Sequence, residues 1–239
     1  QVQTDTIKTG TFDFINIHVA SMASNEPLKS DFSAEEAEKE AKTRTMYFKM
    51  IGKHIFGTAN ILAWGSYLGA KWIPGQVEIN VAKFEFMHKY QLGYPYLIWY
   101  LIYLTRQYLS ISANGARAPT GIDRPCQHAY EDVNGKAVVM SSKGARGRFN
   151  RAQRAAYNMD ETLPLFSTGI LASSVALGPV ALIPALISMY GRIKFGNLYK
   201  VSLEGRSAGF MPSIVAEMWS AGLVFLCAVK GIAGPAIPI

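Results

Sequence analysis

The chain has 239 residues, of which 12% are aromatic and only 17% are charged, and its mean hydropathy is +0.10. Because an average soluble domain carries about 25% charged residues, this composition excludes a disordered chain and an ordinary soluble domain. Residues 1–43 have a net charge of −4 and residues 44–239 a net charge of +11. The apolar part is therefore also the basic part, which favours a membrane protein with positive loops over a nucleic-acid-binding protein.

Residues 1–89 predict a helical N-terminal extension. Ser33 and Glu36 form a capping-box pattern, which predicts a solvated helix of about fifteen residues. Residues 55–70 are sixteen uncharged residues, which we interpret as an interfacial or partner-packed helix, with a fifth membrane span as the alternative. We expect the polar arm at the start of the chain to lie against another surface. Because the first residue is Gln1, we also expect a processed form.

Four later stretches reach the length that a bilayer crossing needs, about 20 apolar residues. They are Leu92–Ala113, about Phe149–Leu177, Pro179–Tyr199 and about Ser207–Val229. Only Gly178 and Pro179 separate the second stretch from the third, so these two helices are expected to form an antiparallel hairpin. The sequence thus predicts an all-α integral membrane protein, with a four-helix transmembrane bundle over residues 90–239.

The loops between these helices differ in charge. Residues 114–154 carry eight Lys and Arg against three acidic residues, and residues 192–206 carry four against one. The turn at residues 178–179 has no charge. In a four-helix topology both basic loops lie on the same side, which is expected to face the cytosol, the mitochondrial matrix or the plastid stroma. We therefore expect the membrane of the endoplasmic reticulum or of an organelle.

One face of the second apolar helix suits the binding of a small zwitterion. Arg154, Asn158 and Glu161 are spaced i, i+4 and i+7, so they lie one turn apart on the same face. The arginine can bind a carboxylate through two hydrogen bonds, and the glutamate can bind an ammonium group. The alternative is a solvated helix end with its own ion pairs.

A second face carries another set of candidates. Arg192, Phe195 and Tyr199 share one face of the third apolar helix, and Arg206 follows seven residues after Tyr199. The alternative here is that the basic residues snorkel to the membrane surface at a helix end. The cysteines Cys126 and Cys227 are isolated, and the four histidines show no ligand spacing, so no disulfide framework and no metal site is expected.

Both faces belong to a longer pattern. Residues 147–155 read GRFNRAQRA and are followed by Asn158, Glu161 and Pro164. Further positions of the pattern are Ala116, Arg117, Arg124, Pro125, Gln127, His128, Tyr130, Gly191, Arg192, Tyr199 and Arg206. Over about residues 90–233 this pattern strongly resembles the membrane-associated proteins in eicosanoid and glutathione metabolism (MAPEG), in their microsomal glutathione transferase branch. Residues 1–89 lie outside the resemblance.

The resemblance implies a homotrimer with a glutathione site between neighbouring protomers, near the basic face. By position, the residues that would bind glutathione as co-substrate are Arg154, Asn158, Glu161, Arg192, Tyr199 and Arg117. Arg206 stands where the family has its catalytic arginine, and a nearby guanidinium lowers a thiol pKa from about 8.5. The implied activity is a transferase or peroxidase that acts on hydrophobic electrophiles or lipid peroxides from the bilayer.

Three positions depart from the family pattern. Phe195 stands where many active members have tyrosine, Thr162 where some have an aromatic residue, and Ala156 where a polar residue is common. The alternative function is a non-catalytic structural subunit of a larger respiratory or photosynthetic membrane complex, which the extra 89 residues favour, and a lipid binder is a third candidate.

Arg106 and Glu217 lie in apolar runs, and we expect them to pair with each other or with a partner subunit.

Overall fold

The computed structural model describes residues 32–124 and 126–234, which are mostly helical. The expected packing of the polar arm falls largely on residues 1–31, outside the described residues. The main helices are α1 (Ala34–Gly52), α2 (Ala59–Gly69), α3 (Gln76–Lys89), α4 (Gly93–Arg117), α5 (Gly144–Val201) and α6 (Ser207–Ala233). Shorter helical segments are η1 (Lys53–Thr58), η2 (Ala70–Trp72), η3 (Ala118–Thr120) and η4 (Glu204–Arg206), and the strands are β1 (Tyr130–Val133) and β2 (Ala137–Met140).

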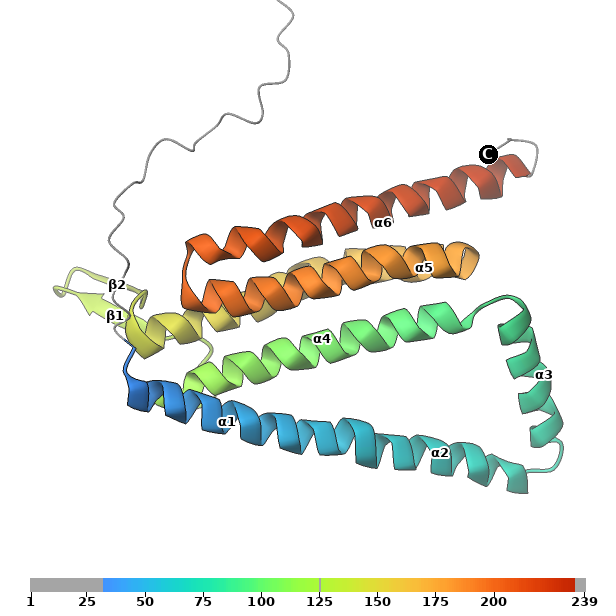
Figure 1. Ribbon diagram of the computed structural model, residues 1–239, viewed down its shortest axis with the longest axis horizontal. Helices are drawn as coiled ribbons and strands as arrows, with labels where there is room; N and C mark the ends of the chain where they lie inside the picture. The colour runs from blue at the N-terminus through green and yellow to red at the C-terminus, as the bar shows by residue number, and fades with distance from the viewer. Residues whose placement is uncertain (1–31, 125, 235–239) are drawn as a thin grey trace, which may run out of the picture. The chain divides into compact units, whose positions relative to one another are not determined.

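Helix α1 begins at the predicted capping box. The Glu36 N–H donates to Ser33 Oγ at 3.1 Å, and the Ser33 N–H donates to Glu36 Oε2 at 2.8 Å, so both residues satisfy backbone donors at the helix start. The helix is longer than predicted, because it continues through the π-helical segment η1 into α2. Figure 1 shows α1 and α2 as one long helix, with α1 beside α4 and α3 crossing from the end of α2 to the start of α4.

Helix α5 contains both the second and the third predicted stretch. At Leu177 the backbone leaves the helical region, with φ −126° and ψ 41°, just before Pro179. Contacts join the two arms in antiparallel order: Arg192 bonds Asn158, and farther from the break on both arms the Arg151 Nε–H donates to the Lys200 carbonyl at 3.2 Å. The antiparallel hairpin predicted from Gly178 and Pro179 is therefore confirmed.

The core lies where α4, both arms of α5 and α6 meet. Apolar side chains that are fully or almost fully buried there include Ile98, Ile102, Leu109, Met159, Ile170 and Leu223. Two glycines allow α6 to approach the second arm of α5, because a Cβ on Gly209 would lie 2.1 Å from the Phe195 nitrogen and a Cβ on Gly191 2.5 Å from Ser213 Oγ. Close helix contact through small residues is typical of helices that pack in membranes.

Two helices among the described residues are long and apolar enough to cross a membrane, judged by length and composition: Gly144–Val201, which includes both arms of α5, and Glu204–Ala233. Helix α4 also has the length, but it contains Arg106 and many tyrosines. A bundle of four membrane crossings therefore stays a prediction, as does the division of the chain after residue 89.

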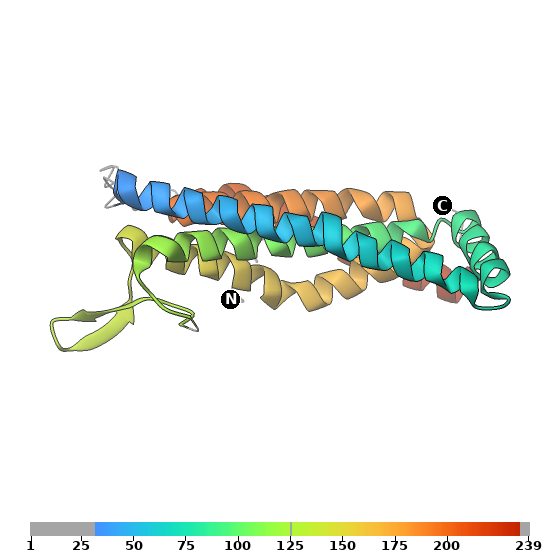
Figure 2. The ribbon, with the colours of Figure 1, turned by 90° about the horizontal axis from the view of Figure 1, so that it is seen from below.

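The loop after α4 contains a β-hairpin that the sequence analysis did not predict, so the described part of the chain is not purely α. Strands β1 and β2 pair antiparallel, with Tyr130 opposite Met140. Asn134 and Gly135 have positive φ angles of 56° and 67°, which is typical of an Asn-Gly hairpin turn. The hairpin projects from the end of the helices at which α4 ends and α5 begins (Figure 2).

The buried amide of Asn150 fixes this loop to α5. Its Nδ2 donates to the carbonyls of Ala129 and Ser141, and its Oδ1 accepts from the Ala129 N–H, each at 2.8 Å. A buried amide with three such bonds is well satisfied. Asn150, which is part of the GRFNRAQRA pattern, therefore holds the basic loop against the first arm of α5 through these hydrogen bonds.

Candidate functional site

The exposed face of the first arm of α5 carries Arg154 and Glu161. Arg154 Nη1 and Nη2 donate to the two carboxylate oxygens of Glu161, at 2.6 and 3.1 Å. The side chains are 49% and 52% exposed, so the pair lies open at the surface of a single chain. An exposed pair of this kind adds little to stability, and each partner remains accessible to a ligand.

Asn158, from the same face, bonds into the protein. Arg192, on the second arm of α5, is buried and donates to both the side-chain and the main-chain oxygen of Asn158. It also donates to Thr162 Oγ1 at 2.6 Å and forms an ion pair with Glu217 of α6. Arg192 thus connects both arms of α5 to α6.

The predicted pairing of Arg106 with Glu217 is wrong, and the alternative of a partner subunit stays a prediction. Arg106 bonds Asp160 through Nε at 2.5 Å and Nη2 at 2.8 Å, and Glu217 pairs with Arg192. The physical reason is that α4 and α6 each pack against α5, which supplies an opposite charge to each of them. Arg106 and Glu217 therefore each have an opposite charge within their own chain.

The remaining predicted site residues have different surroundings. The ring of Tyr199 stacks on that of Phe195, with centroids 5.2 Å apart. Arg117 turns into its own loop, where it donates to the carbonyls of Asp123 and Cys126, and its guanidinium lies 4.6 Å from the centre of the Phe149 ring. These contacts hold the Arg117 side chain within the loop after α4.

Arg206 differs from the other candidates because its side chain is exposed and has no hydrogen-bond or ion-pair partner among the described residues. It is the last residue of η4 and precedes the first residue of α6. Its guanidinium makes no hydrogen bond or ion pair with any residue between 32 and 124 or between 126 and 234. A free guanidinium at a helix start is available to an anionic ligand, since a helix N-terminus adds partial positive charge.

Sequence reasoning missed a contact between the loop after α4 and the first arm of α5. Gln127 Oε1 accepts from Gln153 Nε2 at 2.7 Å and from the Tyr157 hydroxyl at 2.5 Å. Gln153 and Tyr157 are spaced i, i+4, next to the face of Arg154 and Asn158. The spacing was readable, but no local signal identified Gln127 as the partner.

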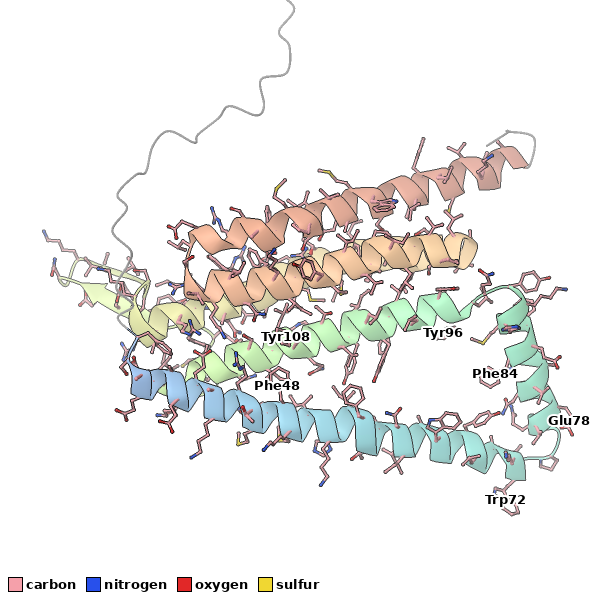
Figure 3. All side chains as sticks on the ribbon, in the orientation of Figure 1. Phe48, Trp72, Glu78, Phe84, Tyr96 and Tyr108 are labelled. Carbon is pink, nitrogen blue, oxygen red and sulfur yellow. The ribbon has the colours of Figure 1, made fainter. Side chains whose placement is uncertain are left out.

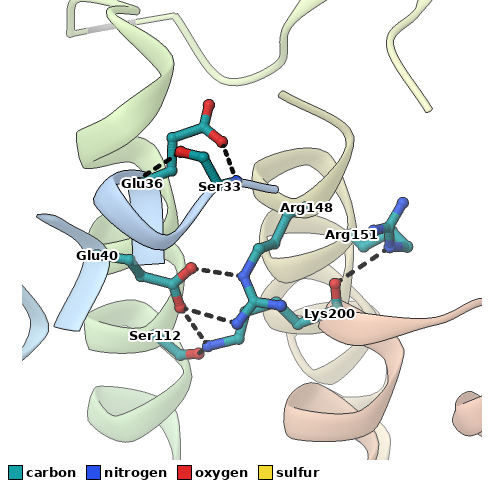
Figure 4. A network of polar contacts seen from close by, with 7 residues as sticks. All are labelled: Ser33, Glu36, Glu40, Ser112, Arg148, Arg151 and Lys200. Carbon is teal, nitrogen blue, oxygen red and sulfur yellow. Dashed lines mark hydrogen bonds and ion pairs between the residues drawn. The ribbon is translucent and has the colours of Figure 1, made fainter. Parts of the chain in front are cut away.

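Sequence reasoning also missed a buried ion cluster that joins α1 to the rest of the chain (Figure 4). Glu40 of α1 binds Lys200 Nζ at 2.7 Å and Arg148 Nε at 2.5 Å, and Lys200 also contacts Ser112 Oγ at 3.4 Å. Burial by itself raises the pKa of the Glu40 carboxyl, but the hydrogen bonds and charges of Arg148 and Lys200 hold this pKa below its ordinary value. The cluster fixes α1 at the basic end of α4 and α5.

Two hollows on the surface of the described residues lie away from the predicted glutathione residues. One hollow lies along α1 beside Met46 and Lys49, and another lies beside Lys143 and Arg146 in the basic loop. Neither is lined by a residue that the resemblance assigns to glutathione. No group of three His, Cys, Asp or Glu side chains within the described ranges could hold a metal ion.

Long apolar helices with basic loops at one end are typical of α-helical membrane proteins. The MAPEG family model matches residues 96–226. Because this match covers more than half of the chain, the protein belongs to the MAPEG family. A comparison with curated proteins gives no significant match.

Proposed function

We propose that this protein is a membrane-embedded glutathione transferase or peroxidase of the microsomal type. Family membership supports the proposal. The single observation that carries it is the exposed guanidinium of Arg206, which has no bonding partner among the described residues. The open pair of Arg154 and Glu161 lies on the preceding helix hairpin and offers a cation for a carboxylate and an anion for an ammonium group. Glutathione has carboxylates and an ammonium group, together with a thiol.

In the proposed reaction the glutathione thiol loses its proton to water, and Arg206 stabilises the resulting thiolate. The sulfur electron pair then forms a carbon–sulfur bond with a hydrophobic electrophile, whose leaving group departs with the electrons of the broken bond. With a lipid hydroperoxide, two glutathione molecules supply two electrons and two protons. The oxygen–oxygen bond then breaks to give an alcohol and water, and the two sulfurs form a disulfide.

We further infer that the working form is a homotrimer of four-helix transmembrane bundles made of α4, the two arms of α5 and α6. The exposure of Arg154 and Glu161 in a single chain supports a site that a neighbouring protomer completes. The same proposal places the basic loops on the cytosolic, matrix or stromal side of an endoplasmic reticulum or organellar membrane.

The test is conjugation of glutathione to a hydrophobic electrophile by the purified, detergent-solubilised protein. Arg206→Ala should lower kcat/KM at least tenfold, because one positioned cation contributes about 1.4 kcal/mol or more to a thiolate transition state. Arg146→Ala is the matched control, since Arg146 is another exposed arginine at the basic end. Equal activity of the Arg206→Ala variant and the unchanged protein contradicts the proposed mechanism.

Two observations favour the second candidate, a non-catalytic subunit of a larger membrane complex. Asn158 and Arg192 already satisfy one another inside the chain, and Phe195 lacks the hydroxyl that many active members carry. The mass of the native particle in mild detergent separates the two candidates. Three copies of the 26.3 kDa chain support the enzyme, and one copy among foreign subunits supports the structural role.

A further inference from the structure

The long helix formed by α1, η1 and α2 runs antiparallel to α4. Three contacts set the alignment: Glu40 lies within the ion cluster at the basic end, Arg44 lies against Gly115, and the Phe48 ring lies 5.7 Å from the Tyr108 ring. As the helix proceeds toward α2, its partners move back toward the start of α4. Helix α2 therefore lies toward the end of the molecule opposite the basic loops (Figure 1).

The segment between Lys53 and Lys71 has the length of a short bilayer crossing. Residues 54–70 are seventeen residues without Lys, Arg, Asp or Glu. At a helical rise of 1.5 Å per residue, the distance along the axis between the two lysines is about 27 Å, which compares with a hydrocarbon core of about 30 Å and a usual minimum of about 17 residues. Both lysines are exposed, so their amino groups can reach the two membrane surfaces.

Most apolar side chains of this segment are exposed, on more than one side of the helix, although Ile55 is buried and the Tyr67 ring contacts Phe84 of α3. No residue of α2 is buried. Ile61, Leu62 and Trp64 are among the most exposed apolar residues of the described part of the chain, and they point in different directions around the helix axis. A partner protein covers one face of a helix, whereas the acyl chains of a bilayer surround it. Exposure on several sides therefore favours lipid as the occupant.

Two polar side chains within the segment, those of Asn60 and Ser66, bond the backbone of the helix itself. Asn60 Nδ2 donates to the carbonyls of Ile55 and Phe56, at 3.1 and 3.2 Å, and the Ser66 hydroxyl donates to the Leu62 carbonyl at 2.8 Å. Water cannot satisfy polar groups in the hydrocarbon core, so internal bonds of this kind are what a membrane segment needs.

Helix α3 fits a position in the membrane surface opposite the basic loops. None of its residues is buried. The Phe84 ring lies 5.8 Å from the Tyr67 ring of α2, whereas Glu78 lies on the outer side of α3 (Figure 3). Because α3 joins the end of α2 to the start of α4, it lies at the end of the helices opposite the basic loops (Figure 1).

We propose that residues 54–70 cross the bilayer as a membrane segment in addition to the MAPEG bundle, and that α3 lies in the interface on the far side. This arrangement places α1 on the same side as the basic loops, in agreement with the ion cluster of Glu40, Arg148 and Lys200. It is independent of any glutathione chemistry.

Labelling of single cysteines in sealed vesicles tests the crossing. In the full chain with Cys126→Ser and Cys227→Ser, the variants Lys39→Cys and Glu78→Cys each provide one exposed thiol, and a variant that keeps only Cys126 marks the basic side. A membrane-impermeant maleimide should label Lys39→Cys and Cys126 from one face and Glu78→Cys from the other. Labelling of Lys39→Cys and Glu78→Cys from the same face overturns the proposal.

A charge in the middle of the segment tests whether lipid surrounds it. Leu62 is 65% exposed and Met46, in α1, is 53% exposed, so in water an arginine is tolerated equally at both positions. Within a bilayer, Leu62→Arg should shift the crossing equilibrium on the order of a hundredfold, so the opposite labelling of Lys39→Cys and Glu78→Cys is lost. Met46→Arg should leave the labelling unchanged. Equal labelling patterns for the two arginine variants overturn the proposal.

Discussion

The buried carboxylate of Glu40 predicts a large loss of stability when its charge is removed. The side chains of Glu40 and Lys200 are 5% and 3% exposed, so Glu40→Gln leaves the Lys200 ammonium buried without an anion. Removal of one partner of a buried ion pair costs about 3–5 kcal/mol. Arg148 is more exposed and can turn toward water, so the lower end of this range is expected. At roughly 2–4 °C per kcal/mol for a chain of this size, Tm should fall by roughly 6–12 °C.

The assay is thermal unfolding in detergent, followed by circular dichroism, together with limited proteolysis of α1. Glu38→Gln is the matched control, because Glu38 is exposed on the same helix, and it should leave Tm within about 1 °C, since surface substitutions change stability little. A double variant, Glu40→Gln with Lys200→Met, should recover part of the loss because no buried charge then lacks a partner. Equal Tm values for Glu40→Gln and Glu38→Gln would refute the reasoning.

Three further predictions concern the charged groups between the helices. The pKa of Glu40 lies below its ordinary value of 4.5, so the carboxylate stabilises the docked α1 above that value, and this stabilisation is lost as the pH falls through the folded-state pKa. Tm measured against pH should therefore fall in acid for the unchanged protein, and it should fall by a smaller amount for Glu40→Gln. Glu217→Gln leaves Arg192 buried without its anion and should cost about 3 kcal/mol, measured by unfolding in detergent. Asp160→Asn should cost less in the same assay, because the side chains of Asp160 and Arg106 are about one third exposed and can be solvated; a larger loss than for Glu217→Gln contradicts this order.

Local sequence signals predicted much of the fold. The capping box at Ser33 and Glu36 and the turn at Gly178 and Pro179 depend on neighbouring residues, so the start of α1 and the hairpin of α5 were readable. The β-hairpin carried a local signal as well, the pair Asn134 and Gly135. It was missed because the loop was assessed for charge and not for turn chemistry.

The pairing of charges could not be read in the same way. Arg106, Asp160, Arg192 and Glu217 come from three helices, and their partners depend on the rotation of each helix about its axis, which packing in the assembled fold sets. Glu40 lies in a run of charges that reads as a solvated helix, and only tertiary contact shows that it is buried. The face of Arg154, Asn158 and Glu161 was predicted from spacing, but the spacing did not show that Asn158 bonds inward.

The central claim is that Arg206 stabilises the thiolate of bound glutathione. Ultraviolet difference spectroscopy measures it most directly, because the thiolate absorbs where the thiol does not, and a titration of the purified protein with glutathione near neutral pH gives the amount of thiolate formed. We expect a saturable thiolate signal for the unchanged protein and for Arg146→Ala, and the loss of this signal in Arg206→Ala. Glutathione binding without a thiolate signal, or an undiminished signal in Arg206→Ala, would contradict the central claim.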